Sequence, residues 1–242
     1  MEGSVGEPFH PGTPRFGIGA GRLSRVSSGR SGCDDGAMPT GVYLRSDPFE
    51  PDRPVLERFS CAPGPVGWRY AASTHDVETA EQVGRVDVTV DSHWRQVRVE
   101  LVAGAWTLRG GVTGREVLWV RSGAGGADAA EHVAEAAGLC GASPAFLVTT
   151  ARMLGLAPGE VTSVALVGVG GAALATRTLR QRWTFAEVIE HPTDLRPLRV
   201  ERYEVADLDT GEVAEVHLAG DVVVAGPGIE LTELEGPPTD IV

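Results

Sequence analysis

The sequence contains no lysine and no asparagine, so all 21 of its basic residues are arginine. Lysine and asparagine have AT-rich codons, and we interpret their absence as the mark of a GC-rich genome. The number of arginines is therefore weak evidence for an anion-binding site. The missing lysine also excludes chemistry that needs its amine: a Schiff base, a pyridoxal phosphate anchor or a phosphate-binding P-loop.

Cysteine is scarce and odd in number, with Cys33, Cys61 and Cys140 widely spaced and no CxxC pair. This usage predicts no disulfide framework and is typical of a reducing cytoplasm. The histidines show no metal-ligand spacing with one another or with the cysteines, so we expect no metal and no other cofactor. No apolar run approaches the roughly 20 residues of a membrane-spanning helix, and the first residues lack a secretion signal. We therefore predict a cytoplasmic protein without a transmembrane segment.

Negative charge exceeds positive charge, giving a formal net charge of −12 over 242 residues. This balance argues against nucleic acid or an acidic membrane surface as the partner. Residues 1–37 are rich in glycine and serine and have no apolar periodicity, which predicts a disordered tail. Two explanations of that tail stay open: a functional arm, or a translation start assigned upstream of the true one at Met38. Residues 38–242 are predicted to form a single β-rich ligand-binding domain.

Alternation of apolar and polar residues predicts about ten strands, joined by short turns. The strands are expected at 84–91, 93–102, 105–111, 115–121, 161–168, 175–185, 198–206, 211–219, 221–226 and 228–234. One apolar helix interrupts them, with Ser143 as its N-cap, Pro144 at its first position and Gly155 at its end. The alanine-rich segment 127–138 also favours helix by intrinsic propensity.

This pattern predicts a mainly β (α+β) fold, in which a strongly curved antiparallel sheet or open barrel carries one or two helices over its concave face. The central helix is then a lid or plug for that face. After the helix, the segment "LVGVGGAALA" follows an apolar strand and matches the dinucleotide-binding pattern G-x-G-x-x-A at Gly168, Gly170 and Ala173. No βαβ repeat surrounds the match, so we interpret it as a glycine-rich turn between strands.

Tryptophan and arginine on the predicted strands, with residues of the helix, are the candidate ligand contacts. Tryptophan and arginine at a cavity wall suit a sugar, an acyl chain or an anionic head group, although core tryptophans and surface arginines are the commoner explanation for each residue. The candidate ligand-binding residues are Trp106, Trp119, Phe146, Arg152, Arg180, Arg182 and Trp183.

The segments "SPAFLVTTARMLGLAPGE", "RQRWTF", "VERYEVADLDTGE" and "AGDVVVAGPGIELTEL" resemble the bacterial glycolipid-binding family, whose function is itself inferred from its fold. Ser143-Pro144 matches the family's Thr-Pro, Arg152 the first arginine of its pair, and residues 180–183 its RQRY strand. Leu147 and Met153 replace a family asparagine and the second arginine. The resemblance implies a curved sheet similar to periplasmic lipoprotein carriers, and binding of an amphipathic molecule.

From these observations we expect a non-enzymatic protein that holds a small amphipathic, lipid-like or glycolipid-like ligand between sheet and helix. One alternative is an enzyme acting on a hydrophobic small molecule in the same cavity, with His75, Glu116 or Glu204 as acid or base. Another is a scaffold that forms a homodimer and uses the sheet to bind a protein.

Overall fold

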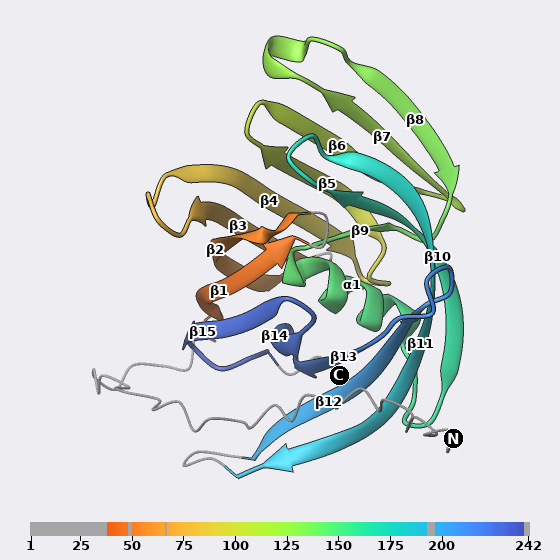
Figure 1. Ribbon diagram of the computed structural model, residues 1–242. Helices are drawn as coiled ribbons and strands as arrows, with labels where there is room; N and C mark the ends of the chain where they lie inside the picture. The colour runs from red at the N-terminus through yellow and green to blue at the C-terminus, as the bar shows by residue number, and fades with distance from the viewer. Residues whose placement is uncertain (1–37, 48–49, 66, 193–196, 240–242) are drawn as a thin grey trace, which may run out of the picture. The chain divides into compact units, whose positions relative to one another are not determined.

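The computed structural model describes residues 38–47, 50–65, 67–192 and 197–239. The tail predicted for residues 1–37 lies outside these described residues. Within them, fifteen strands form one sheet. The fold class predicted from the sequence is confirmed: the sheet is mostly antiparallel, open and curved around one α-helix, as Figure 1 shows. No helix in the described part of the chain is long and apolar enough to cross a membrane.

The sheet consists of two meanders that meet side by side. The first contains β1 (Thr40–Asp47), β2 (Glu50–Gly64), β3 (Gly67–Asp76), β4 (Gln82–Asp91), β5 (Gln96–Ala103), β6 (Trp106–Thr113), β7 (Glu116–Ser122) and β8 (Ala130–Glu135). The second contains β9 (Leu139–Gly141), β10 (Val161–Gly170), β11 (Ala175–His191), β12 (Leu198–Asp207), β13 (Val213–Ala219), β14 (Val222–Gly226) and β15 (Ile229–Glu235). They join where β1 pairs with β15, which leaves β8 and β9 as the two edges.

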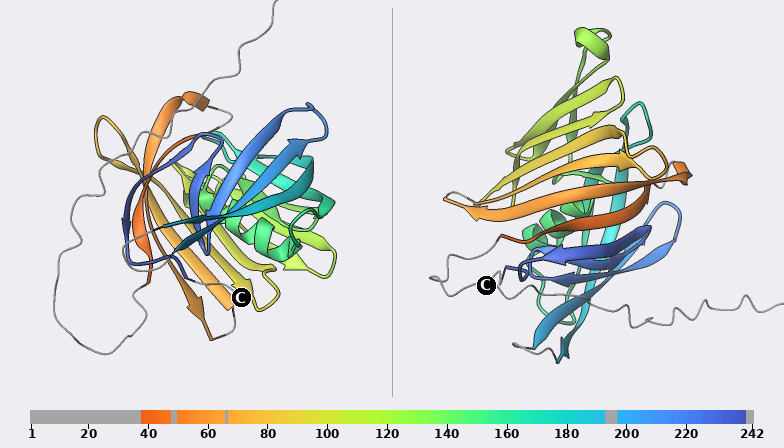
Figure 2. Two further views of the ribbon diagram at one scale, coloured as in Figure 1. Left: turned by 90° about the horizontal axis from the view of Figure 1, so that it is seen from below. Right: turned by 90° about the vertical axis from the view of Figure 1, so that its left-hand side faces the viewer.

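Because successive side chains of a strand point to opposite faces, the alternation of residue types gives the sheet one buried face and one more exposed face. On β4, Val86, Val88 and Val90 are buried, whereas Asp87 and Thr89 lie between them on the other face. The buried set faces the helix, and the two further views in Figure 2 show the sheet curving around it. The core therefore fills the trough between the sheet and the helix.

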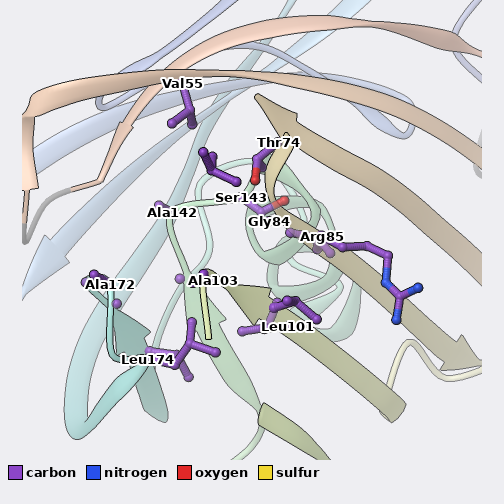
Figure 3. A pocket seen from close by; sticks show the side chains of 18 of the residues that line it. Val55, Thr74, Gly84, Arg85, Leu101, Ala103, Ala142, Ser143, Ala172 and Leu174 are labelled. Atoms are coloured by element: carbon purple, nitrogen blue, oxygen red, sulfur yellow. The ribbon is translucent and has the colours of Figure 1, made fainter. Parts of the chain in front are cut away.

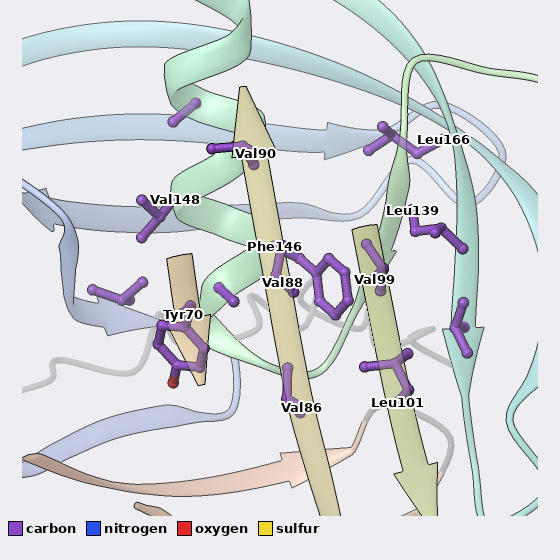
Figure 4. Packing of buried hydrophobic residues seen from close by; sticks show 14 of the residues in the cluster. Tyr70, Val86, Val88, Val90, Val99, Leu101, Leu139, Phe146, Val148 and Leu166 are labelled. Carbon is purple, nitrogen blue, oxygen red and sulfur yellow. The ribbon is translucent and has the colours of Figure 1, made fainter. Parts of the chain in front are cut away.

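Helix α1 (Pro144–Leu154) begins and ends where the sequence predicts. Gly155 adopts the left-handed conformation (φ +55°), and its N–H donates to the carbonyl of Ala151 at 3.1 Å. The helix contacts β9 and β14, and Phe146 lies among Val88, Val99 and Leu139 in Figure 4. Because strands surround its first turns, the helix is buried over more than one face.

The prediction of a helix in the alanine-rich segment 127–138 is wrong. Residues Ala130–Glu135 form the edge strand β8, which pairs antiparallel with β7 along its whole length. Alanine's helix preference is worth only a few tenths of a kcal/mol per residue over most residues. A ladder of hydrogen bonds to β7 outweighs that preference. Strands β1 and β2, which precede this region of the chain, have no counterpart in the predicted set.

A glutamine side chain covers the short edge strand β9. The Gln96 Nε2 donates to the carbonyl of Leu139 at 2.9 Å, and the Leu139 N–H donates to Gln96 Oε1 at 2.7 Å. The primary amide thus pairs with this edge as a neighbouring strand would, and satisfies groups that would otherwise be orphaned in the core.

Candidate functional site

A buried carboxylate lies at the beginning of helix α1. Glu57 occupies an inward position of β2, between Val55 and Phe59, and its side chain is 0% exposed. It forms an ion pair with Arg45 of β1, and it accepts hydrogen bonds from Tyr70 Oη at 2.8 Å and Ser143 Oγ at 2.5 Å. Ser143 stands at the N-cap position of α1, yet its hydroxyl binds Glu57 rather than a backbone N–H of the helix.

Burial keeps the hydroxyl groups of two nearby tyrosines protonated. Burial, and then the charge of Glu57, raise the pKa of Tyr70 well above its ordinary value, so its hydroxyl stays a neutral donor. The pKa of Tyr43, whose hydroxyl accepts the N–H of Val223, is also raised by burial.

A second carboxylate lies at the other end of the helix. Arg152, in the last turn of α1, donates from Nη1 to Glu201 Oε2 at 2.6 Å and from Nη2 to the carbonyl of Gly220 at 2.6 Å. Tyr203 Oη donates to the same Glu201 oxygen at 3.0 Å. Burial, followed by the charge of Glu201, raises the pKa of Tyr203. An Arg–Glu–Tyr cluster therefore binds each end of the helix, through Ser143 at its beginning and through Arg152 in its last turn.

A cavity of about 600 Å³ opens beside the beginning of α1. Strands β1–β5 and β10, the segment 141–143 and the turn after β10 line it. Figure 3 shows Thr74 and Ser143 toward one end, with Leu101, Ala103 and Leu174 toward the other. Arg45 and Arg53 also line the cavity, from β1 and β2. The lining thus changes from polar near β1–β3 to apolar near β5 and β10.

The glycine-rich motif runs from the end of β10, which contains Gly168 and Gly170, into the β10–β11 turn, and Leu174 of this turn lines the apolar end of the cavity. Leu174 adopts a left-handed conformation (φ +49°), which is unfavourable for a branched side chain, and it is nevertheless 7% exposed. Arg121 of β7 donates to the carbonyl of Ala173 at 3.1 Å, and its guanidinium lies 4.5 Å from the centre of the Trp106 ring. The turn is therefore tied across the trough to the first meander.

A second cavity, of about 680 Å³, lies at the other end of the helix. Arg152 and Met153 of α1, Trp94 and Arg95 of the β4–β5 turn, and Val164 of β10 are among its lining residues. Trp94 has a positive φ (+62°) and packs on Trp68, with 5.6 Å between ring centres. Loops supply half of its lining residues, and charged side chains of both signs, Arg95, Arg115, Arg152 and Glu135, are among them.

The structure distributes the seven candidate ligand residues over several places. Phe146 lines the first cavity and Arg152 the second, while Trp106 supports Arg121. The other four lie elsewhere: Trp119 stacks on His132, Trp183 is buried with Nε1 bound to Gln181, Arg180 pairs with Asp209, and Arg182 is exposed on the same outward face as Arg180. The seven do not share one wall, and their ligand-binding role stays a prediction.

The polar residues beside the first cavity were missed at the sequence level. Glu57 shares one face of β2 with Val55, Phe59 and Cys61, so the sequence does contain a signal for it: a glutamate on an otherwise apolar face. His75, Glu116 and Glu204, the acid or base candidates of the enzyme alternative, are not among the residues that line either cavity.

Comparison with known proteins finds one similar structure and no similar sequence family. No protein-family model matches the chain, and no curated protein sequence matches it. Among solved structures, the chain is similar to a DUF1089 family protein from Pseudomonas aeruginosa. The two are 16% identical, the match covers 84% of this chain and 97% of the other, and the TM-score is 0.43. A similarity of this size does not bear on ligand or activity.

Proposed function

We propose that this protein binds a small amphipathic molecule, lipid-like or glycolipid-like, in the cavity beside the beginning of helix α1, without catalysing a reaction on it. The observation that carries the proposal is the gradient along the cavity, from Thr74 and Ser143 to Leu101 and Leu174. A volume of about 600 Å³ falls within the range typical of pockets for small ligands.

The state of the polar groups supports binding over catalysis. Glu57 Oε1 accepts from both Tyr70 and Ser143, and Oε2 binds Arg45, so the carboxylate is saturated with donors. Ser143 donates its hydroxyl hydrogen to an acceptor that is itself held by an arginine, and no histidine is among the described residues lining this cavity. A serine without a free base beside it is a weak nucleophile.

Isothermal titration calorimetry with neutral monoacylglycerols of 8, 10 and 12 carbons tests the proposal. Each methylene buried in an apolar site contributes about 0.8 kcal/mol, so two methylenes tighten binding by about fifteenfold. We expect affinity to rise with chain length until the apolar end is full. Failure of every chain length to bind, both as the monoacylglycerol and as the fatty acid of equal length, at concentrations below aggregation, would refute the proposal.

A matched pair of substitutions locates the binding site. Ala103→Phe introduces a ring at the apolar end of the cavity, whereas Ala71→Phe places the same ring on β3 on the face opposite the buried Ala72. We expect A103F to abolish binding of the longer chains and A71F to leave it unchanged, with both variants folded by circular dichroism. Equal effects of the two variants would place the ligand elsewhere.

A dimerising scaffold is the second candidate, and one surface favours it. Leu118 and Val120 of β7 and Val133 of the edge strand β8 are 44%, 40% and 58% exposed on the outward face. Exposed apolar residues beside an open edge are a site for pairing with another chain. Sedimentation equilibrium of the wild type and of Val133→Glu tests this: a dimer that V133E dissociates supports it, and a wild-type monomer excludes it.

A further inference from the structure

We infer that the ligand is a single-chain amphiphile with an anionic head group, held with its head near Arg53 and its chain toward Leu174. This inference rests on the proposed function and specifies the head-group class and the orientation of the bound molecule. It depends on which charges face the cavity and on where they lie along it.

Positive charge alone lines this cavity in a protein that is otherwise acidic. The chain has 33 acidic and 21 basic residues, yet the charged residues that line the cavity are Arg45, Arg53 and Arg85, with no aspartate or glutamate among the described ones. An anionic head group would meet attractive charges here and repulsive ones over much of the remaining surface.

Two of the three arginines are already committed to carboxylates. Arg45 is paired with the buried Glu57. Arg85 extends away from the cavity in Figure 3 and pairs with Glu100, whose carboxylate lies on the outward face. Burial acts to raise the pKa of Glu100, but its arginine neighbours outweigh burial and lower that pKa overall. Both guanidinium groups already have a carboxylate partner, so neither is the main group that attracts a ligand anion.

Arg53 differs from both. Among the described residues its ion pair is with Asp76 at 4.0 Å, at the outer limit for such a contact, and its side chain is 61% exposed. Asp76 Oδ1 also accepts the backbone N–H groups of Glu78 and Thr79, which hold it in its own turn. Arg53 can therefore turn its planar guanidinium to a ligand carboxylate or sulfate in a two-pronged hydrogen bond.

The position of Arg53 sets the orientation of the ligand. Val55 of β2 lies near Thr74 and Ser143 in Figure 3, whereas Leu101, Ala103 and Leu174 lie at the apolar end. Arg53 lines the cavity from the same strand, two residues before Val55. A head group at Arg53 places the following alkyl chain along Phe146 toward these apolar residues. The reverse orientation would bury an anion against Leu174 and expose the chain at the polar mouth.

Calorimetry with two probes of equal chain length tests the inference. Laurate is anionic, and monolauroylglycerol is neutral and rich in hydroxyl groups. We expect Arg53→Gln to weaken laurate binding about threefold to tenfold and to change monolauroylglycerol binding by less than twofold. The effect on laurate should shrink at high salt, because Arg53 is exposed and its charge is screened.

Arg58→Gln is the control variant, because Arg58 is exposed on the same strand, is not among the residues lining the cavity, and removes the same charge. If R53Q and R58Q weaken laurate equally, the effect is one of net charge and the inference is wrong. If the wild type binds both probes and R53Q changes neither, the inference is wrong while the proposed function stands. If the wild type binds neither probe, the proposed function fails with it.

Discussion

Removing the positive charge of Arg45 tests how far the buried cluster at the beginning of α1 determines stability. Glu57 is 0% exposed, and Arg45 is its only cationic partner among the described residues. Arg45→Met keeps most of the side-chain volume and leaves the carboxylate with Tyr70 and Ser143 as donors. Losing one partner of a buried pair costs about 3–5 kcal/mol, because the remaining charge is uncompensated.

We expect the lower end of that range, since two hydroxyl donors remain on Glu57. A loss of about 3 kcal/mol corresponds to a fall of roughly 6–12 °C in melting temperature for a chain of this size. Urea unfolding at neutral pH measures the loss. The double variant R45M/E57Q removes both charges and keeps an acceptor for the hydroxyls, and should recover most of the stability. A loss below about 1 kcal/mol in R45M, or no recovery in the double variant, would refute the reasoning.

Four shorter predictions concern other parts of the chain. Ala80 (φ +57°) and Gly211 (φ +79°) occupy the same left-handed position of two similar turns. Because this conformation is unfavourable for a residue with a Cβ atom, Ala80→Gly should stabilise the protein and Gly211→Ala should destabilise it, each by about 1 kcal/mol in urea unfolding. Changes of the same sign would contradict this. Backbone N–H groups, that of Thr210 first, lower the pKa of Asp207, so its negative charge stabilises the fold above a pH of about 4 and this contribution is lost as the pH falls through the lowered pKa. The difference in unfolding free energy between the wild type and Asp207→Asn should therefore shrink in acid. A difference that grows in acid would contradict this. Arg121→Gln should release the β10–β11 turn and speed both binding and dissociation of a cavity ligand in stopped flow, and unchanged rates would mean that the turn does not control entry. Deleting residues 1–37 should leave the melting temperature unchanged, and a fall of more than a few degrees would show that the tail contributes to the fold.

Much of the second half of the fold could be predicted from the sequence because its signals are local. The strand at 161–168 is observed as Val161–Gly170, and Ser143, Pro144 and Gly155 mark the ends of α1 correctly. Such patterns depend on neighbours in the chain. The edge strand β8 was missed because its stability comes from pairing with β7, whereas its alanines favour helix when considered alone.

The candidate site could not be predicted in the same way, because its contacts span the chain. Ser143 lies 86 residues from Glu57, and Arg152 lies 49 residues from Glu201. Which strand faces the helix depends on the order of the sheet, and that order places β1 beside β15. The sequence does show an acid on the apolar face of β2, but not the arginine and hydroxyls that neutralise it.

Each end of α1 contacts an Arg–Glu–Tyr cluster, one from each meander. These contacts indicate whether the helix can move when a ligand binds. The pairs Arg69-Tyr70 and Arg202-Tyr203 each precede a turn of sequence D-x-[DE]-T-[AG]-E, at Asp76 and Asp207. In each meander the tyrosine donates to an inward glutamate that also binds an arginine. Moving the helix out of the trough would take Ser143 from Glu57 at one end and Arg152 from Glu201 at the other. The second loss leaves a largely buried carboxylate without its arginine, at a cost of about 3–5 kcal/mol. A rigid helix favours a cavity that is already shaped before the ligand arrives, with entry that does not require displacement of α1.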